Sequence, residues 1–185
     1  AEVEAHADEL LRTSAVVRLA DDEARGPADP RYTTPGMLAL ERELLDAAGR
    51  RRGEGAARAE AAQVDRVLAE RPELSGEQAA MVRDLAGSGD GVQVVRAAAG
   101  TGKTFALEAA RHAWEASGCR VLGCALSARA ATELQAQAGI DATTIACLTG
   151  ELDRGHSLRA GDVLVVDEAG MVGTRTIGRL AGHAD

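Results

Sequence analysis

The chain reads Val92-Gln93-Val94-Val95-Arg96-Ala97-Ala98-Ala99-Gly100-Thr101-Gly102-Lys103-Thr104 near its centre. The β-branched run predicts a strand over Val92–Val95, and a helical pattern follows from Phe105 to Ser117. A strand, a glycine-rich loop and a helix N-terminus in this order form the setting of a phosphate-binding loop. The sequence therefore predicts that nucleotide phosphates bind in this loop.

Each loop residue has a separate expected role. Gly100 and Gly102, with Thr101 between them, let the backbone turn and point its N–H groups at phosphate oxygens. Lys103 would reach the β- and γ-phosphates, and the Thr104 hydroxyl would be a ligand of Mg²⁺. Lys103 is the only lysine in the chain, and a compact ammonium fits a loop around a phosphate better than a planar guanidinium.

The loop departs from the usual pattern G-x-x-x-x-G-K-[ST] at its first position. That position holds Ala97 instead of glycine, and a small residue fits there if its φ angle is negative. The alternative is a glycine-rich start of a helix that binds nothing.

A second motif lies at Asp162-Val163-Leu164-Val165-Val166-Asp167-Glu168-Ala169-Gly170. The apolar run predicts a buried strand over Val163–Val166, which ends abruptly in two carboxylates. In a P-loop ATPase, Asp167 would bind the Mg²⁺ shell and Glu168 would polarise the attacking water. The alternative is that both are ordinary polar residues at a strand end.

The composition limits the function classes. A chain of 185 residues with net charge -8 and a pI near 5.1 fits one domain, or one core with a helical appendage. Its acidity counts against a dedicated nucleic-acid-binding module but leaves room for a basic groove. Alanine makes up about a fifth of the residues and aromatic residues 2%, so we expect a closely packed core of Ala, Val and Leu.

Targeting signals and cysteine usage suggest a cytoplasmic protein. No apolar run approaches the roughly 20 residues of a membrane span, and no signal peptide is visible. Cys119, Cys124 and Cys147 lack the spacing of metal ligands, so we interpret them as small apolar residues in a reducing compartment. Because the chain begins with Ala, we expect it to be part of a longer protein.

The remaining pattern predicts mostly helices. The Thr34-Pro35 pair is a helix start, and Ser75-x-x-Gln78 is a capping box. The basic residues Arg50 to Arg52 form either a phosphate-binding patch or a solvated loop. We expect a helix at 3–11 and a linker at 20–31, with Tyr32 also in a linker. We further expect helices at 35–47, 57–68, 75–87 and 127–137, a strand at 120–126 and a helical segment at 143–152.

Five segments together resemble the first half of a superfamily 1 helicase core of the RecD-like kind. They are Leu74–Gln78 (the adenine-reading Q motif), Ala99–Thr104 (motif I), Ala125–Ala131 (motif Ia), Ala142–Ile145 (the Thr-Ile segment after it) and Val165–Val172 (motif II). The stretch from Tyr32 to Leu45 is similar to the lead-in of conjugative relaxase–helicases of the TraI/TrwC (MobF) type.

This resemblance implies a fold and an activity. The fold is α/β: a RecA-like P-loop NTPase with a parallel sheet and helices on both faces, incomplete and preceded by a helical N-terminal segment. The implied activity is an ATP- and Mg²⁺-dependent motor on single-stranded DNA. Gln78 would read adenine in addition to capping its helix. Ser127 and Thr144 would contact the DNA backbone, or would only cap helices.

The resemblance also implies how the chain is divided into parts and which parts of the helicase and relaxase it does not contain. Residues 1–31 would be a helix and linker from a preceding region, 32–74 a helical lead-in, and 75–185 the N-terminal part of the ATPase lobe. The second helicase lobe is absent, as are the histidine cluster and active tyrosine of a relaxase domain. We therefore expect the chain alone to hydrolyse ATP weakly or not at all.

Two other functions stay open. The first is a RecD-type DNA repair helicase. The second is a P-loop ATPase that does not bind DNA.

Overall fold

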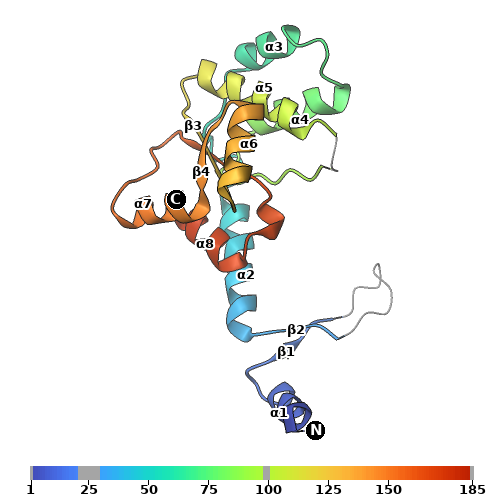
Figure 1. The fold of residues 1–185 in the computed structure, drawn as a ribbon. Coiled ribbons are helices and arrows are strands. Elements are labelled where there is room, and N and C mark those ends of the chain that lie inside the picture. Colours follow the sequence, from blue (N-terminus) through green and yellow to red (C-terminus); the bar gives the residue numbers. More distant parts are fainter. Residues whose placement is uncertain (1, 21–29, 98–100, 184–185) are drawn as a thin grey trace. The chain divides into compact units, whose positions relative to one another are not determined.

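The computed structural model describes residues 2–20, 30–97 and 101–183. The chain divides into two units, Ala1–Asp46 and Ala47–Asp185. Figure 1 shows the order of the elements along the chain. Of the helices in the described ranges, none has both the length and the apolar character needed to cross a lipid bilayer.

In its described residues, the first unit contains two helices and a two-stranded antiparallel sheet. Helix α1 (Glu2–Leu11) forms as predicted, and helix α2 (Pro35–Arg50) continues into the second unit. Thr34 Oγ1 accepts a hydrogen bond from the backbone N–H of Met37 at 3.2 Å, as expected for a helix cap. Most of the predicted linker (21–29) lies outside the described residues.

Tyr32 was predicted to belong to the linker, and that prediction is wrong. Strand β2 (Tyr32–Thr33) pairs antiparallel with β1 (Val17–Arg18), and Val17 lies opposite Thr33. Two-residue strands are too short to show an alternating apolar pattern, so the sequence carried no strand signal here.

The second unit contains a parallel three-stranded sheet with helices on both faces, which confirms the α/β fold class. Strand β3 (Val121–Ala125) lies between β4 (Asp141–Thr144) and β5 (Val163–Val166). Leu122 lies opposite Asp141 on one side, and Val121 lies opposite Val163 on the other. Because the strands are parallel, their carboxyl ends meet at one edge of the sheet, where ligands bind in open α/β folds.

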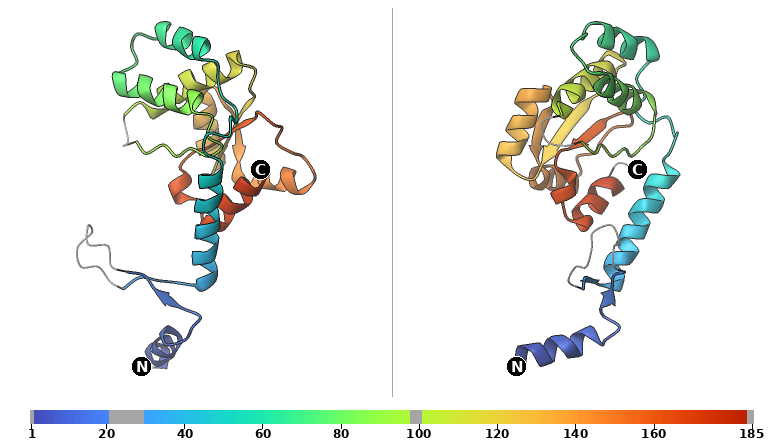
Figure 2. Two further views of the ribbon diagram at one scale, coloured as in Figure 1. Left: turned by 180° about the vertical axis from the view of Figure 1, so that it is seen from behind. Right: turned by 90° about the vertical axis from the view of Figure 1, so that its right-hand side faces the viewer.

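Alternate residues of β5 face two different cores. Val163 and Val165 pack with the helices of the first core, whereas Leu164 and Val166 pack with those of the second. The helices are α3 (Ala61–Ala69), α4 (Gly76–Gly87), α5 (Lys103–Ala116) and α6 (Ala128–Ala138) for the first core, and α7 (Ile145–Asp153) and α8 (Thr174–Gly182) for the second. Both views of Figure 2 place α3 and α4 at the end of this unit away from α7 and α8.

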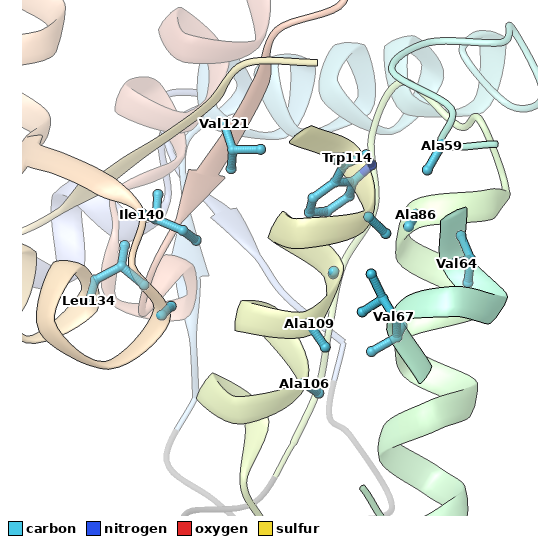
Figure 3. Packing of buried hydrophobic residues seen from close by; sticks show 14 residues of the cluster. Ala59, Val64, Val67, Ala86, Ala106, Ala109, Trp114, Val121, Leu134 and Ile140 are labelled. Atoms are coloured by element: carbon cyan, nitrogen blue, oxygen red, sulfur yellow. The ribbon is translucent and has the colours of Figure 1, made fainter. Parts of the chain in front are cut away.

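The first core depends on small residues and one large one. Figure 3 shows Trp114 of α5 between Val121 of β3 and Ala86 of α4. The buried alanines of α5 let α3 and α4 approach closely. On β3, a Cβ at Gly123 would lie 2.9 Å from both Leu134 Cδ2 and Ala142 Cβ, so only glycine fits. This bears out the expected small-residue core.

Polar contacts join the starts of two strands. Arg120, just before β3, donates from Nε to Asp162 Oδ1 at 3.0 Å, and Asp162 lies just before β5. The Asp162 carboxylate also accepts from the backbone N–H of Arg159 at 2.8 Å. The bond from Arg120 and, to a smaller extent, that from Arg159 hold the pKa of Asp162 below its usual range. These contacts help to fix the register of β5 against β3.

The predicted strand at Val92–Val95 is wrong. The described residues 92–97 form no strand, and Val94 is 82% exposed. A β-branched run becomes a strand only when a neighbouring strand satisfies its backbone groups. Among the described residues, β5 pairs with β3 alone, so Val92–Val95 has no pairing partner.

Two helix starts also differ from the predictions. Thr143 and Thr144 belong to β4, and helix α7 starts only at Ile145. The apolar residues keep a helical spacing on the N-terminal side of the cap at Thr144 as well. The pattern therefore did not show where helix α7 begins. Ala57 was predicted to begin a helix, but its φ angle is +42°, and α3 starts at Ala61. A left-handed backbone is incompatible with a helix start.

Candidate functional site

The two sequence motifs meet at the carboxyl edge of the sheet. Lys103 is the first residue of α5, and Asp167 directly follows β5. Lys103 Nζ lies 3.7 Å from Asp167 Oδ1. The backbone N–H of Asp167 donates to the carbonyl of Cys124 at 2.9 Å, which continues the β3–β5 ladder and fixes the carboxylate at the strand end. A cation and a carboxylate are thus brought together from residues 64 positions apart in sequence.

The N-terminus of α5 is suited to an anion. The first backbone N–H groups of a 14-residue helix have no partner within the helix, and the helix dipole favours negative charge there. Gly102 precedes the helix with φ +72°, a conformation that glycine adopts without steric cost. Thr104 is half-buried in the first turn. Gly100 lies outside the described residues, so its predicted role has no structural description.

Glu168 has an unusual backbone conformation. Its φ and ψ angles are +50° and +36°, which costs a residue with a side chain about 1–3 kcal/mol. Its side chain is exposed, next to the half-buried Asp167. Such strain occurs where the surrounding structure fixes it, commonly at functional sites.

The donor set fits a hard divalent cation bound with phosphates. Mg²⁺ prefers one or two carboxylate or hydroxyl oxygens together with phosphate oxygens and water. Thr104, in the first turn of α5, offers one hydroxyl, and Asp167, directly after β5, offers one carboxylate. Among the described residues, no cluster of three or more His, Cys, Asp or Glu side chains could hold a metal by itself. The residues therefore fit a metal that arrives with a nucleotide.

Gln78 joins helix α4 to the phosphate loop. The predicted capping box is present: the backbone N–H of Gln78 donates to Ser75 Oγ at 3.2 Å, and Gln78 Oε1 accepts from the Ser75 N–H at 2.9 Å. The other end of the same amide, Nε2, donates to the carbonyl of Thr101 at 3.0 Å. A Cβ at Gly102 would collide with this nitrogen. Sequence reasoning did not find the contact with the loop, which joins residues 23 positions apart.

Ser127 and Thr144 both cap helices. Ser127 Oγ accepts from the N–H of Ala130 at 3.1 Å, and Thr144 Oγ1 accepts from the N–H of Cys147 at 3.1 Å. Each hydroxyl keeps its own hydrogen for donation. Both residues lie at the carboxyl edge of the sheet, after β3 and at the end of β4. Contact with DNA therefore stays a prediction for both.

Comparison with known proteins identifies the family. A family model described as an AAA domain matches residues 73–185, which include both motifs and all the residues of the candidate site. The chain belongs to this AAA-domain family.

The chain is similar to proteins that are named as conjugal transfer proteins. The AAA-domain chain is 35% identical over 159 residues to the conjugal transfer protein TraA of Rhizobium radiobacter, covering 84% of this chain and 14% of that protein. A probable conjugal transfer protein TraA of Sinorhizobium fredii is 37% identical over 155 residues, covering 82% and 14%. The chain thus spans about one-seventh of the length of these relatives. The expected resemblance to a RecD-like helicase domain of a conjugative transfer protein is confirmed.

Proposed function

We propose that this chain is the ATP-binding and ATP-hydrolysing region of a helicase or translocase that acts on single-stranded DNA in the cytoplasm. The observation that carries the proposal is the approach of Lys103 to Asp167 at the carboxyl edge of the sheet. A P-loop ATPase needs this arrangement of a cation for the phosphates and a carboxylate for the metal.

We propose a role for each side chain of the site. Lys103 and the N-terminal N–H groups of α5 bind the β- and γ-phosphates. Thr104 and Asp167 hold Mg²⁺, which neutralises phosphate charge when bound. Glu168 accepts a proton from the attacking water. Gln78 holds the loop through Thr101 and contacts adenine.

The names of the relatives favour one parent protein over the alternatives. The similar TraA proteins are named as conjugal transfer proteins, which favours a conjugative relaxase–helicase over a RecD-type repair helicase. We propose that a relaxase domain and a second helicase lobe belong to the same parent protein. We also propose that residues 1–31, 32–74 and 75–185 are its separate parts in this region.

The test of the function is ATP hydrolysis with and without single-stranded DNA. Since the relatives are several times longer, we would measure the full-length gene product beside the 185-residue chain. We expect DNA to accelerate hydrolysis at least about tenfold in the longer protein, as in a motor whose closure depends on its track. Hydrolysis at the same rate without DNA would instead support a P-loop ATPase that does not bind DNA.

Gln78 allows a test of how the loop is held. In Gln78→Glu the carboxylate still accepts from Ser75 but cannot donate to Thr101, and its charge faces the Thr101 carbonyl. We expect ATP and GTP affinity to fall together by about tenfold, the effect of one hydrogen bond to a fixed partner. Fluorescent nucleotide analogues would report both affinities.

The matched control is Gln137→Glu on the exposed face of α6, which should leave both affinities unchanged. If Gln78→Glu weakened ATP and left GTP unaffected, base reading would be the main role of Gln78, and the contact with Thr101 would be of minor importance.

A further inference from the structure

The segment that leads into the phosphate loop is held by few contacts. Residues 92–97 form no strand, and their side chains are exposed. Between the described residues, this segment makes one hydrogen bond: Gln93 Nε2 donates to the carbonyl of Leu85, in the last turn of α4, at 2.9 Å. The last four carbonyls of a helix have no partner within it, so the Leu85 carbonyl is available for this bond. Sequence analysis assigned no role to Gln93.

A corner of the chain fixes the start of the same segment. The backbone N–H of Gly55 donates to the carbonyl of Gly89 at 2.9 Å, and that of Gly91 donates to the carbonyl of Arg51 at 2.8 Å. Gly89 has a φ angle of +71°, and a Cβ there would lie 3.2 Å from Gly55 Cα, so the corner favours glycine. The chain therefore leaves a fixed point two residues before Gln93.

Helix α4 contacts the chain on both sides of the phosphate loop. Gln78, in its first turn, donates to the carbonyl of Thr101 at 3.0 Å, and Leu85, in its last turn, accepts from Gln93. Positions 78 and 85 lie about 10 Å apart along a helix axis. Val82, between them, is fully buried in the first core, so the helix is a firm support. Gln93 holds the entry of the loop as Gln78 holds its exit.

We propose that Gln93 is a positioning residue of the nucleotide site, which fixes the entry of the phosphate loop against α4. The inference rests on the proposed function and adds a residue that acts through the loop, without contact with the base. A loop that is already ordered loses less conformational entropy when a phosphate binds, so an anchor outside the site raises the affinity. Because the anchor acts on the loop, it affects every ligand that carries the same phosphates.

The test is the affinity of the full-length gene product for two probes with Mg²⁺: a fluorescent ATP analogue, and inorganic tripolyphosphate in competition with it. Gln93→Met keeps the length of the side chain and adds no charge, but it removes the donor to Leu85. We expect both affinities to fall about fivefold, the effect of one neutral hydrogen bond. Gln135→Met on the exposed face of α6 is the matched control and should change neither affinity.

A double-variant cycle shows whether Gln93 and Gln78 act on the same loop. Tripolyphosphate is the ligand for the cycle, because it has no base for Gln78 to contact. One anchor orders the loop less once the other end is released, so we expect Gln78→Glu with Gln93→Met to lose about twentyfold, less than the product of about fiftyfold for independent sites. Losses that simply multiply would overturn the joint action of the two glutamines on the loop.

Other outcomes would overturn the proposal in distinguishable ways. If Gln93→Met lowers the midpoint of thermal unfolding and binds both probes like the wild type, Gln93 only caps α4, and the proposed function is unaffected. If it weakens the ATP analogue but not tripolyphosphate, Gln93 acts on the base or the ribose and not on the loop. If the wild type binds neither probe, the phosphate loop itself is wrong, and the proposed function fails with it.

Discussion

Replacement of Lys103 by alanine is expected to abolish ATP turnover, with a loss of at least about 100-fold in the full-length protein. Lys103 is the first residue of α5. Among the described residues, it is the only cation that forms an ion pair with Asp167. Without it, the developing charge on the transferred phosphoryl group loses its main protein partner, an effect worth about 3–4 kcal/mol in comparable sites. Single-turnover hydrolysis and binding of a fluorescent ATP analogue would measure the change.

A conservative variant separates charge from shape. Lys103→Arg keeps the charge but replaces a compact ammonium by a wide planar group, so we expect it to fail nearly as completely as the alanine variant. Arg66→Ala is the matched control, because it removes an exposed cation from another helix, α3. Full turnover by Lys103→Ala would contradict the assignment of the phosphate loop.

The sequence predicted an element correctly where the prediction depended on residues close to one another in the chain. The capping box at Ser75 and Gln78, the helix predicted from Phe105 to Ser117 and the apolar strand Val163–Val166 all depend on residues within a few positions of one another. The structure shows each of them. The order of these elements also predicted that Lys103 and Asp167 lie close together, as the structure shows, although the strand expected at Val92–Val95 before the loop does not form.

The predictions failed where the structure depends on distant partners. Val92–Val95 has the composition of a strand, but pairing requires an available neighbouring edge, which composition does not reveal. Strand β4 has only the sequence Asp-Ala-Thr-Thr, and it forms because β3 supplies a partner. The contact of Gln78 with Thr101 likewise arises from elements that meet only in the folded chain.

Replacement of Glu168 by glutamine is expected to separate binding from hydrolysis. Glutamine has nearly the same shape but cannot accept a proton from water. We therefore expect ATP affinity to change less than about twofold, while turnover falls about 10²–10⁴-fold, the usual contribution of a general base. Because the left-handed backbone at this residue is set by the turn after β5, the variant should retain it and keep the stability of the wild type. Thermal unfolding would confirm that the protein is intact.

The comparison with a second glutamate makes the result specific. Glu151→Gln on the exposed face of α7 makes the same chemical change away from the site, and it should leave turnover unaffected. If Glu168→Gln hydrolysed ATP at the wild-type rate, the two carboxylates after β5 would differ in role: Asp167 would remain at the metal position, and Glu168 would be an ordinary strand-end residue. Its strained backbone would then have no catalytic explanation. A loss of both affinity and turnover would instead show that Glu168 holds the Mg²⁺–nucleotide complex itself, since a carboxylate that only activates water contributes to the transition state and little to the ground state.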